Sequence, residues 1–277
     1  MSNVVEIGTG SSFRSVIINR PEVNNALNGQ VFVELVEAFE TLAKEGTKVV
    51  VLRGQPIPGK SKSTSAGADL STLVRKDDDG YKPLDLDAAL VHMDEGLKAI
   101  EEIVKIRNEA GMLVIGGIEG GEDGKEKGYL LAGALEVFAA VCEIIIVSEN
   151  TILGFPEYDL DGAPGWGGPH QTHRLTGWNP QRTAWLLLGN KIDGITAERW
   201  GIVTRAVAPG TVFDTINKLA DKVVARSPLA TRYALMLARA PLGQNVTEQA
   251  KHFMAHLMMQ PEGWVKSVGA FLDRSKK

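Results

Sequence analysis

Short runs of β-branched residues alternate with amphipathic stretches in the first half of this chain. Residues Arg14–Asn19 and Lys48–Arg53 are largely apolar and bounded by turn residues, so both predict β-strands. Between these runs, Val31, Leu35 and Phe39 recur at helical spacing, with glutamates on the opposite face. Strand, helix and strand in this order predict a parallel βαβ unit with a right-handed crossover.

The same alternation continues as far as Ser148. A helix is expected across Leu84–Asn108, a strand at Met112–Ile118, a helix across Leu130–Val141 and a strand at Ile144–Ser148. Helices layered on a parallel sheet are the architecture that such an order builds. The sequence therefore predicts an α/β fold.

Beyond Trp178 the pattern becomes mainly helical. Helices are expected at Pro180–Leu188, Ala197–Gly201, Val212–Ala225, Ala230–Ala240, Val246–Met258 and Trp264–Asp273. Amphipathic helices without a sheet of their own must bury their apolar faces on a neighbour. We therefore expect a helical region that packs on the α/β core and makes subunit contacts.

Two loops are rich in Gly, Pro, Ser and charge, a composition typical of mobile segments: Gly54–Ser65 and Glu119–Lys127. Next to them, Ser65–Leu70 and Gly128–Glu136 place small residues where a strand or loop gives way to a helix. Small residues there let a ligand approach the main chain and leave helix-start N–H groups free to donate. Two such groups on one oxygen would stabilise the negative charge that develops on a carbonyl oxygen during enolate formation.

The composition restricts the partners and the compartment. The chain has 277 residues, 44% of them hydrophobic, as in an ordinary globular protein. Its formal net charge of −4 gives no electrostatic reason to expect nucleic acid or an anionic membrane as a partner. The sequence has no run of about 18 apolar residues, so we expect no membrane span. Cys142 is the only cysteine, and the first ten residues lack a signal-peptide pattern, so we expect a soluble cytoplasmic protein.

Several segments, in the right order, resemble the motifs of the crotonase, or enoyl-CoA hydratase/isomerase, superfamily. They are Ile17–Asn28, similar to LNRPxxxNALN; Val49–Gly54 with Ser65–Leu70, similar to VVLTG…SAGADL; Gly128–Glu136, similar to GYALGGGLE; Phe155–Glu157 with Pro164–Gly168, similar to FGxPE…PGxGG; and the later stretches Leu186–Val203 and Glu262–Leu272. The resemblance covers almost the whole chain. One such motif is weak evidence, but the ordered set is specific.

The resemblance implies an α/β fold built as a spiral of ββα turns with a C-terminal helical region. We place the spiral core at residues 1–195 and, at residues 196–277, the helical region that completes the pocket and the oligomer contacts. The resemblance also implies a homotrimer or a dimer of trimers, and an acyl thioester of coenzyme A as substrate. No separate cofactor is expected. His170 and His173 lie three residues apart, but no third ligand stands at supporting spacing, so we expect no metal.

The resemblance also assigns roles to individual positions. The backbone N–H groups of Ala68 and Gly133 correspond to the donors of the oxyanion hole. Trp166 lies in the glycine turn, where it either walls the acyl pocket or packs in the core. The positions that correspond to the binding site for the bent coenzyme A are Val23, Ala26, Ala66, Asp69 and Leu70.

Two acids, Glu136 and Glu157, stand where hydratases of this family carry their glutamates. Hydration requires one group that takes a proton from water and one that delivers a proton to the α-carbon. Two carboxyl groups can share that work if their surroundings differ, because burial raises one pKa and hydrogen bonding lowers the other. In isolation, each glutamate is equally consistent with an ordinary capping or turn residue.

The chain departs from the family pattern around one half of this site. Gly111–Gly120 lacks the usual Lys-Pro pair, about eight extra residues follow at Gly121–Gly128, and Ala132-Gly133-Ala134 replaces three glycines. One extra residue before Cys142 requires a helix bulge or a register shift, which leaves open whether Glu136 points into the pocket. We also expect the Glu119–Lys127 segment to border the pocket mouth.

The favoured function is an enoyl-CoA hydratase, a hydro-lyase that adds water across the C2–C3 double bond of a 2-enoyl-CoA. Three alternatives stay open. The first is an isomerase that uses chiefly one acid, the second is a hydrolase or C–C bond-cleaving member of the family, and the third is a non-catalytic binding protein.

Overall fold

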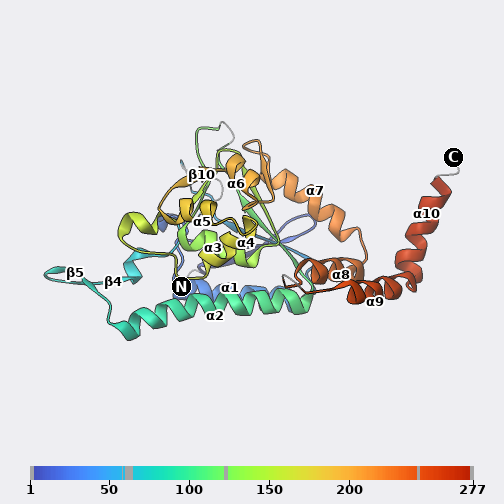
Figure 1. Cartoon of the computed structure of the whole chain (residues 1–277), viewed down its shortest axis with the longest axis horizontal. Coiled ribbons are helices and arrows are strands. Elements are labelled where there is room, and N and C mark those ends of the chain that lie inside the picture. Colours follow the sequence, from blue (N-terminus) through green and yellow to red (C-terminus); the bar gives the residue numbers. More distant parts are fainter. Residues whose placement is uncertain (1–2, 58, 60–64, 122–123, 242–243, 275–277) are drawn as a thin grey trace.

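A six-stranded sheet forms the centre of the computed structural model, which describes residues 3–57, 59, 65–121, 124–241 and 244–274 (Figure 1). Its strand order is β1-β2-β3-β6-β8-β11. The strands are β1 (Val5–Thr9), β2 (Arg14–Ile18), β3 (Val49–Gly54), β6 (Leu113–Ile118), β8 (Ile144–Ser148) and β11 (Arg205–Val207). All neighbours pair in parallel except β1, which is antiparallel to β2.

The predicted βαβ unit is confirmed, because β2 and β3 are parallel neighbours joined through α1 (Gly29–Lys44). Asn28 begins this helix by accepting a hydrogen bond from Val31 N at 3.1 Å. The long helix α2 (Leu86–Ala110) lies beside α1 (Figure 1) and ends at Gly111, which adopts a left-handed conformation.

The alternating side chains of the central strands face two apolar layers. Val50 and Leu52 of β3 pack with α1 and α2 in the main core, whereas Val49 and Val51 face α7 (Val212–Val224). Strands covered by helices on both faces read as continuous apolar runs, which is why the sequence reveals them so clearly.

Two smaller sheets were not predicted. One has the order β10-β9-β7 and consists of β7 (Tyr129–Leu131), β9 (Ile152–Gly154) and β10 (Lys191–Asp193). The other is the hairpin of β4 (Val74–Asp77) and β5 (Gly80–Pro83). The helix expected to begin at Leu130 therefore begins later, as α3 (Ala132–Val141), because Leu130 belongs to β7. A short apolar run alone does not distinguish a strand from a helix.

The C-terminal half is largely helical, as expected. Its helices are α4 (Gly168–Leu175), α5 (Pro180–Leu187), α6 (Gly194–Trp200), α7, α8 (Pro228–Ala238), α9 (Thr247–Met258) and α10 (Lys266–Arg274). Figure 1 shows α10 extending away from the body of the molecule. The division at residue 195 stays a prediction; β11 and α7 both lie on the central sheet and extend the core past that residue.

The segment expected to be mobile, Glu119–Lys127, is anchored where it begins. The Glu119 side chain is buried, and its carboxylate accepts hydrogen bonds from Gly210 N at 3.0 Å and Val212 N at 2.8 Å. Gly120 N donates to Ser148 Oγ at 2.9 Å. The expectation of mobility is therefore wrong for these first residues, because Glu119 satisfies the free N–H groups at the start of α7.

A buried carboxylate joins α8 to the core. Glu143 Oε1 lies 2.7 Å from Arg107 Nη1 and 3.0 Å from Arg239 Nη2, and Glu143 Oε2 accepts a hydrogen bond from Val114 N at 2.9 Å. All three charged side chains are almost completely buried. Among the described residues, Glu143 is the only carboxylate that forms an ion pair with either of these two arginines.

Replacing Glu143 by alanine is expected to lower the free energy of unfolding by about 3–5 kcal/mol, because it leaves buried cations without a counter-ion. Urea unfolding followed by circular dichroism measures this loss. The control is Asp94→Ala, which removes an exposed ion pair with Lys98 and is expected to cost less than about 1 kcal/mol. A similar small loss for Glu143→Ala would show that the network contributes little.

Candidate active site

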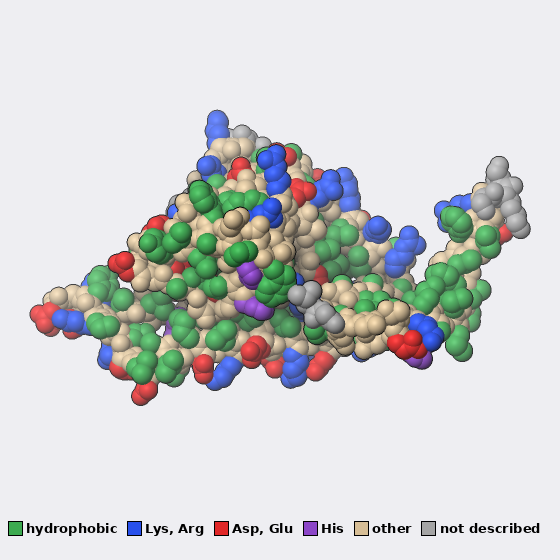
Figure 2. Space-filling view, viewed as in Figure 1, with side chains coloured by type: hydrophobic (Ala, Val, Ile, Leu, Met, Phe, Trp, Pro, Cys, Tyr) green, Lys and Arg blue, Asp and Glu red, His purple; other side chains and the backbone are tan. Residues whose placement is uncertain are grey.

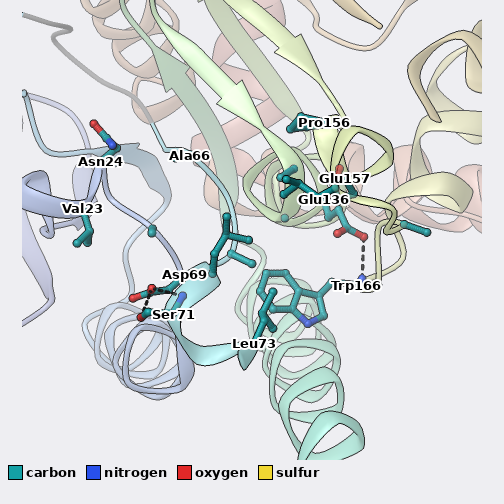
Figure 3. A pocket seen from close by; sticks show the side chains of 18 of the residues that line it. Val23, Asn24, Ala66, Asp69, Ser71, Leu73, Glu136, Pro156, Glu157 and Trp166 are labelled. Atoms are coloured by element: carbon teal, nitrogen blue, oxygen red, sulfur yellow. Dashed lines mark hydrogen bonds between the residues drawn. The ribbon is translucent and has the colours of Figure 1, made fainter. Parts of the chain in front are cut away.

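A cavity of about 410 Å³ opens among the loop 65–73, the start of α3 and the segment that joins β9 to α4 (Figure 3). All the residues that the sequence predicted for the site line this cavity. They are Val23, Ala26, Ala66, Ala68, Asp69, Leu70, Gly133, Glu136, Glu157 and Trp166. Val23 and Trp166, 143 positions apart in the sequence, thus share one cavity.

Backbone pairing fixes the loop that carries Ala68. Leu27 N donates to Gly67 O and Asp69 N donates to Leu27 O, both at 2.8 Å. On the other side, Ser65 N donates to Tyr129 O at 3.1 Å and so connects the loop to β7. Both residues that flank Ala68 are therefore held by hydrogen bonds, which leaves the N–H of Ala68 itself directed away from this pairing.

Two backbone N–H groups lie side by side in the cavity wall. Among the described residues, neither Ala68 N nor Gly133 N has a hydrogen-bond acceptor. Gly133 occupies the first turn of α3, whose N–H groups have no partner within the helix. A Cβ atom built on Gly133 would lie only 3.5 Å from Ala68 N. This arrangement suits a single oxygen that carries negative charge.

The close approach of the two loops explains the small residues around these donors. Gly67 has φ +98°, and a Cβ atom on it would overlap the Ala132 methyl group and lie 3.0 Å from Gly133 N. Only glycine fits there. Ala132 has φ +51°, a left-handed conformation that strains any residue with a side chain. The strained turn lies directly before the donor at Gly133.

Glu136 follows Gly133 by one helical turn and its side chain is 1% exposed. Its Oε2 atom accepts a hydrogen bond from Trp166 N at 2.7 Å (Figure 3) and another from Gly168 N at 2.6 Å. Burial raises the pKa of Glu136, and these backbone donors counteract part of that effect. α3 runs without a bulge from Ala132 to Val141, and Glu136 lines the cavity rather than turning away from it.

Glu157 differs from Glu136 in its hydrogen bonding. It lies in the 3₁₀ helix η3 (Pro156–Leu160), and its Oε2 atom is buried without a hydrogen-bond partner among the described residues. Burial raises the pKa of Glu157 to about 7, and the negative charge of Glu136 acts in the same direction. One cavity thus holds a carboxylate fixed by two donors and a carboxyl group that is partly protonated at neutral pH.

Asp69 is engaged by its own neighbours. Its Oδ2 atom lies 2.9 Å from Arg20 Nη2, and its Oδ1 atom accepts a hydrogen bond from Ser71 Oγ at 2.6 Å. Burial alone would raise the pKa of Asp69, but the bonds from Ser71 and Arg20 lower it overall. Asp69 also begins the short helix η2 (Leu70–Thr72). Its role toward coenzyme A stays a prediction.

The two alternatives for Trp166 turn out to be compatible. The indole lines the cavity, and it is also 3% exposed and part of the main core. It packs edge-to-face on Phe32, with ring centroids 4.8 Å apart. Trp166 therefore forms part of the cavity wall and also packs in the main core.

Several lining residues were missed by the sequence analysis. They are Asn24, Ser71, Leu73, Met93, Ala132, Pro156, Leu160, Ala163 and Gly165. Most lie in loops or turns, where no periodicity marks a side chain that faces a cavity, and Met93 gives the same signal as any core residue of a helix. The described residues of the Glu119–Lys127 segment do not line the cavity, contrary to expectation.

The histidines considered as ligands are occupied otherwise. His173 Nδ1 lies 3.2 Å from Thr183 Oγ1, and the rings of His170 and His173 both contact Trp178. In the part of the chain that the structure describes, no group of three or more His, Cys, Asp or Glu side chains could hold a metal ion. None of the described helices is long and apolar enough to cross a membrane.

Comparison with known proteins now identifies the class. The sequence profile of the enoyl-CoA hydratase/isomerase family matches residues 8–95 and 126–277, so the chain belongs to this family and is an enoyl-CoA hydratase-like enzyme. Between the two matched ranges, residues 96–125 include β6 and most of the segment whose sequence departs from the family motif.

Individual relatives agree with this membership. A protein of Arabidopsis thaliana described as probable enoyl-CoA hydratase 2, mitochondrial, is 25% identical over 271 residues, which cover 97% of this chain and 82% of the relative. The solved structure of Pseudomonas aeruginosa DspI has a TM-score of 0.79 at 22% identity, covering 99% of this chain and 95% of that one. An enoyl-CoA hydratase structure from Bacillus anthracis has a TM-score of 0.78 at 21% identity, covering 98% and 96%. The expected crotonase-type α/β fold with its C-terminal helices is confirmed.

Proposed function

We propose that this chain is a 2-enoyl-CoA hydratase, which adds water across the C2–C3 double bond of an enoyl thioester. The observation that carries the proposal is the pair of unlike carboxyl groups, Glu136 and Glu157, beside two free N–H groups in one cavity. The name of the Arabidopsis relative supports the same reaction. An acyl group attached to coenzyme A is the proposed substrate, and no separate cofactor takes part.

In the proposed reaction, the thioester oxygen lies between Ala68 N and Gly133 N. The Glu136 carboxylate takes a proton from a water molecule while the water oxygen bonds to C3. The electron pair of the double bond moves toward the thioester oxygen, where the two N–H groups stabilise the enolate. Glu157, in its protonated form, then delivers a proton to C2. The sum is one water added, with the proton at C2 and the hydroxyl group at C3.

The pH dependence follows from the proton positions. Glu157 must be protonated to deliver its proton, so kcat/KM should fall as the pH rises through about 7, the pKa of this group. Glu136 must be ionised, so kcat/KM should also fall on the acidic side. Initial rates between about pH 5 and about pH 9 measure both limbs. A profile that is flat through pH 7 would contradict the role given to Glu157.

A panel of acyl-CoA and enoyl-CoA esters, with the products identified by mass, tests the proposal. A hydratase adds the mass of one water to a 2-enoyl-CoA. An isomerase leaves the mass unchanged, a hydrolase releases free coenzyme A, and a binding protein yields no product. Only the first result agrees with the proposal.

We also propose that the chain assembles as a homotrimer or a dimer of trimers. Figure 2 shows hydrophobic side chains along the arm that α9 and α10 form. From α8 to α10, the large exposed apolar side chains are Met236, Met254, Met258, Met259, Trp264, Val265, Phe271 and Leu272. An exposed apolar surface of this kind suits a subunit interface. Within one chain, no described residue after Trp166 lines the cavity, so a contribution of residues 196–277 to the pocket requires a neighbouring copy.

A further inference from the structure

The cavity ends at the indole of Trp166. Ring atoms Cε3 and Cζ3 occupy the space that a Cβ atom on Gly133 would need, so the indole lies directly against the residue that supplies one of the two N–H donors. Figure 3 shows the indole beside Leu73, on the opposite side of the cavity from Asn24 and Ala66. A thioester held by the donors therefore has the indole next to its reacting carbons.

The indole is fixed on its far side as well. Its five-membered ring fills the space beside Gly96 of α2, where a Cβ atom would overlap Nε1. The rings of Phe32 and His92 also lie against the indole, with centroids 4.8 Å and 5.8 Å away, and Nε1 is buried without a hydrogen-bond acceptor among the described residues. An indole packed between two glycines has no free rotamer space to move into. It is a rigid wall.

Apolar side chains line the cavity together with this wall. Leu73, Met93, Leu160 and Pro156 line the same cavity, and the Met93 sulfur lies 2.5 Å from where a Cβ atom on Gly165 would be. Leu160 is 64% exposed. An acyl chain longer than the space in front of the indole must therefore leave the cavity, where added methylene groups stay largely in water.

We propose that Trp166 sets the length limit of the acyl group, so that the enzyme takes short, apolar acyl thioesters. This inference rests on the proposed function insofar as the ligand is an acyl-CoA. Removing the indole connects the cavity to the space bounded by Gly96, Gly133 and Phe32. A longer acyl chain then enters the core, and each methylene group it buries tightens binding by about fourfold.

The test compares the dissociation constants of butyryl-CoA and octanoyl-CoA by calorimetry. Both esters are saturated and cannot be hydrated, so the result does not depend on the reaction. In the unmodified enzyme, octanoyl-CoA should bind no more tightly than butyryl-CoA. In Trp166→Ala, octanoyl-CoA should bind at least about tenfold more tightly than butyryl-CoA. Trp166→Phe, which keeps most of the packing and removes the unsatisfied N–H, should shift the ratio in the same direction by a smaller factor.

The matched control is Trp185→Ala, which removes a 51% exposed indole outside the cavity and should leave the ratio unchanged. An unmodified enzyme that gains about fourfold affinity per methylene up to octanoyl-CoA would overturn the inference. An unchanged ratio in the Trp166 variants that fold, Trp166→Phe included, would overturn it too. If the ratio shifts but the ester panel shows no added water, the hydratase proposal fails and the length limit stands. If no ester binds at all, both fail.

Discussion

Replacing either Glu136 or Glu157 by glutamine is expected to lower kcat by about 10²–10⁴. Glutamine keeps the size of each side chain, but it can neither take a proton from water nor deliver one to C2. Rates of hydration of a 2-enoyl-CoA at saturating substrate measure the loss. Binding of a saturated acyl-CoA should survive, because the thioester oxygen is held by backbone N–H groups.

The control for this pair is Asp161→Asn, which changes an exposed acid near Glu157 that does not line the cavity. Asparagine tolerates the left-handed conformation that Asp161 adopts, at φ +55°. The double variant of Glu136 and Glu157 should be little worse than the worse single variant, because groups that act as a unit are not additive. If Glu136→Gln is nearly silent while Glu157→Gln is inactive, one acid suffices and an isomerase is the better account.

Gly133→Ala is expected to lower kcat by about 10²–10³, the effect of losing one oxyanion-hole donor. The new methyl group would overlap Cε3 and Cζ3 of Trp166, so either the indole or the start of α3 must shift. Because Ala68 N lies only 3.5 Å from the same methyl position, a shift separates the two donors. Kinetics on a 2-enoyl-CoA, with circular dichroism to verify folding, test this expectation.

Gly269→Ala is the matched control for that substitution. It also adds a methyl group to a helical glycine, but nothing lies within 4 Å of the new Cβ atom, Gly269 does not line the cavity of its own chain, and it is not one of the exposed apolar side chains proposed for the subunit interface. Its kcat should equal that of the unmodified enzyme. Equal activity of Gly133→Ala and Gly269→Ala would show that the N–H group of Gly133 is not a donor of the oxyanion hole.

The central strands and the site residues could be predicted for different reasons. β2, β3, β6 and β8 are covered on both faces, so their sequences are continuous apolar runs. β1 at the sheet edge and the three-residue strand β7 carry no such signal. Motif resemblance was enough to locate the site residues Ala68, Gly133, Glu136 and Glu157. It could not predict the geometry of their N–H groups and carboxyl groups, which depends on the folded structure.

Long-range packing accounts for what the sequence analysis missed. The extra residue before Cys142 left open whether Glu136 points into the pocket, and the amides of Trp166 and Gly168, some 30 positions later, hold its carboxylate in the cavity. The composition of the Glu119–Lys127 segment indicated a mobile loop, yet Glu119 binds the start of α7 about 90 positions later. Neither contact leaves a periodic trace in the sequence.

Incubation of a short 2-enoyl-CoA in deuterium oxide, followed by mass spectrometry and NMR of the product, tests the central claim most directly. The account predicts a 3-hydroxyacyl-CoA with one deuterium at C2 and the hydroxyl group at C3, formed by the unmodified enzyme and nearly absent with Glu157→Gln. A product that carries deuterium without an added hydroxyl group, or free coenzyme A in its place, would contradict it.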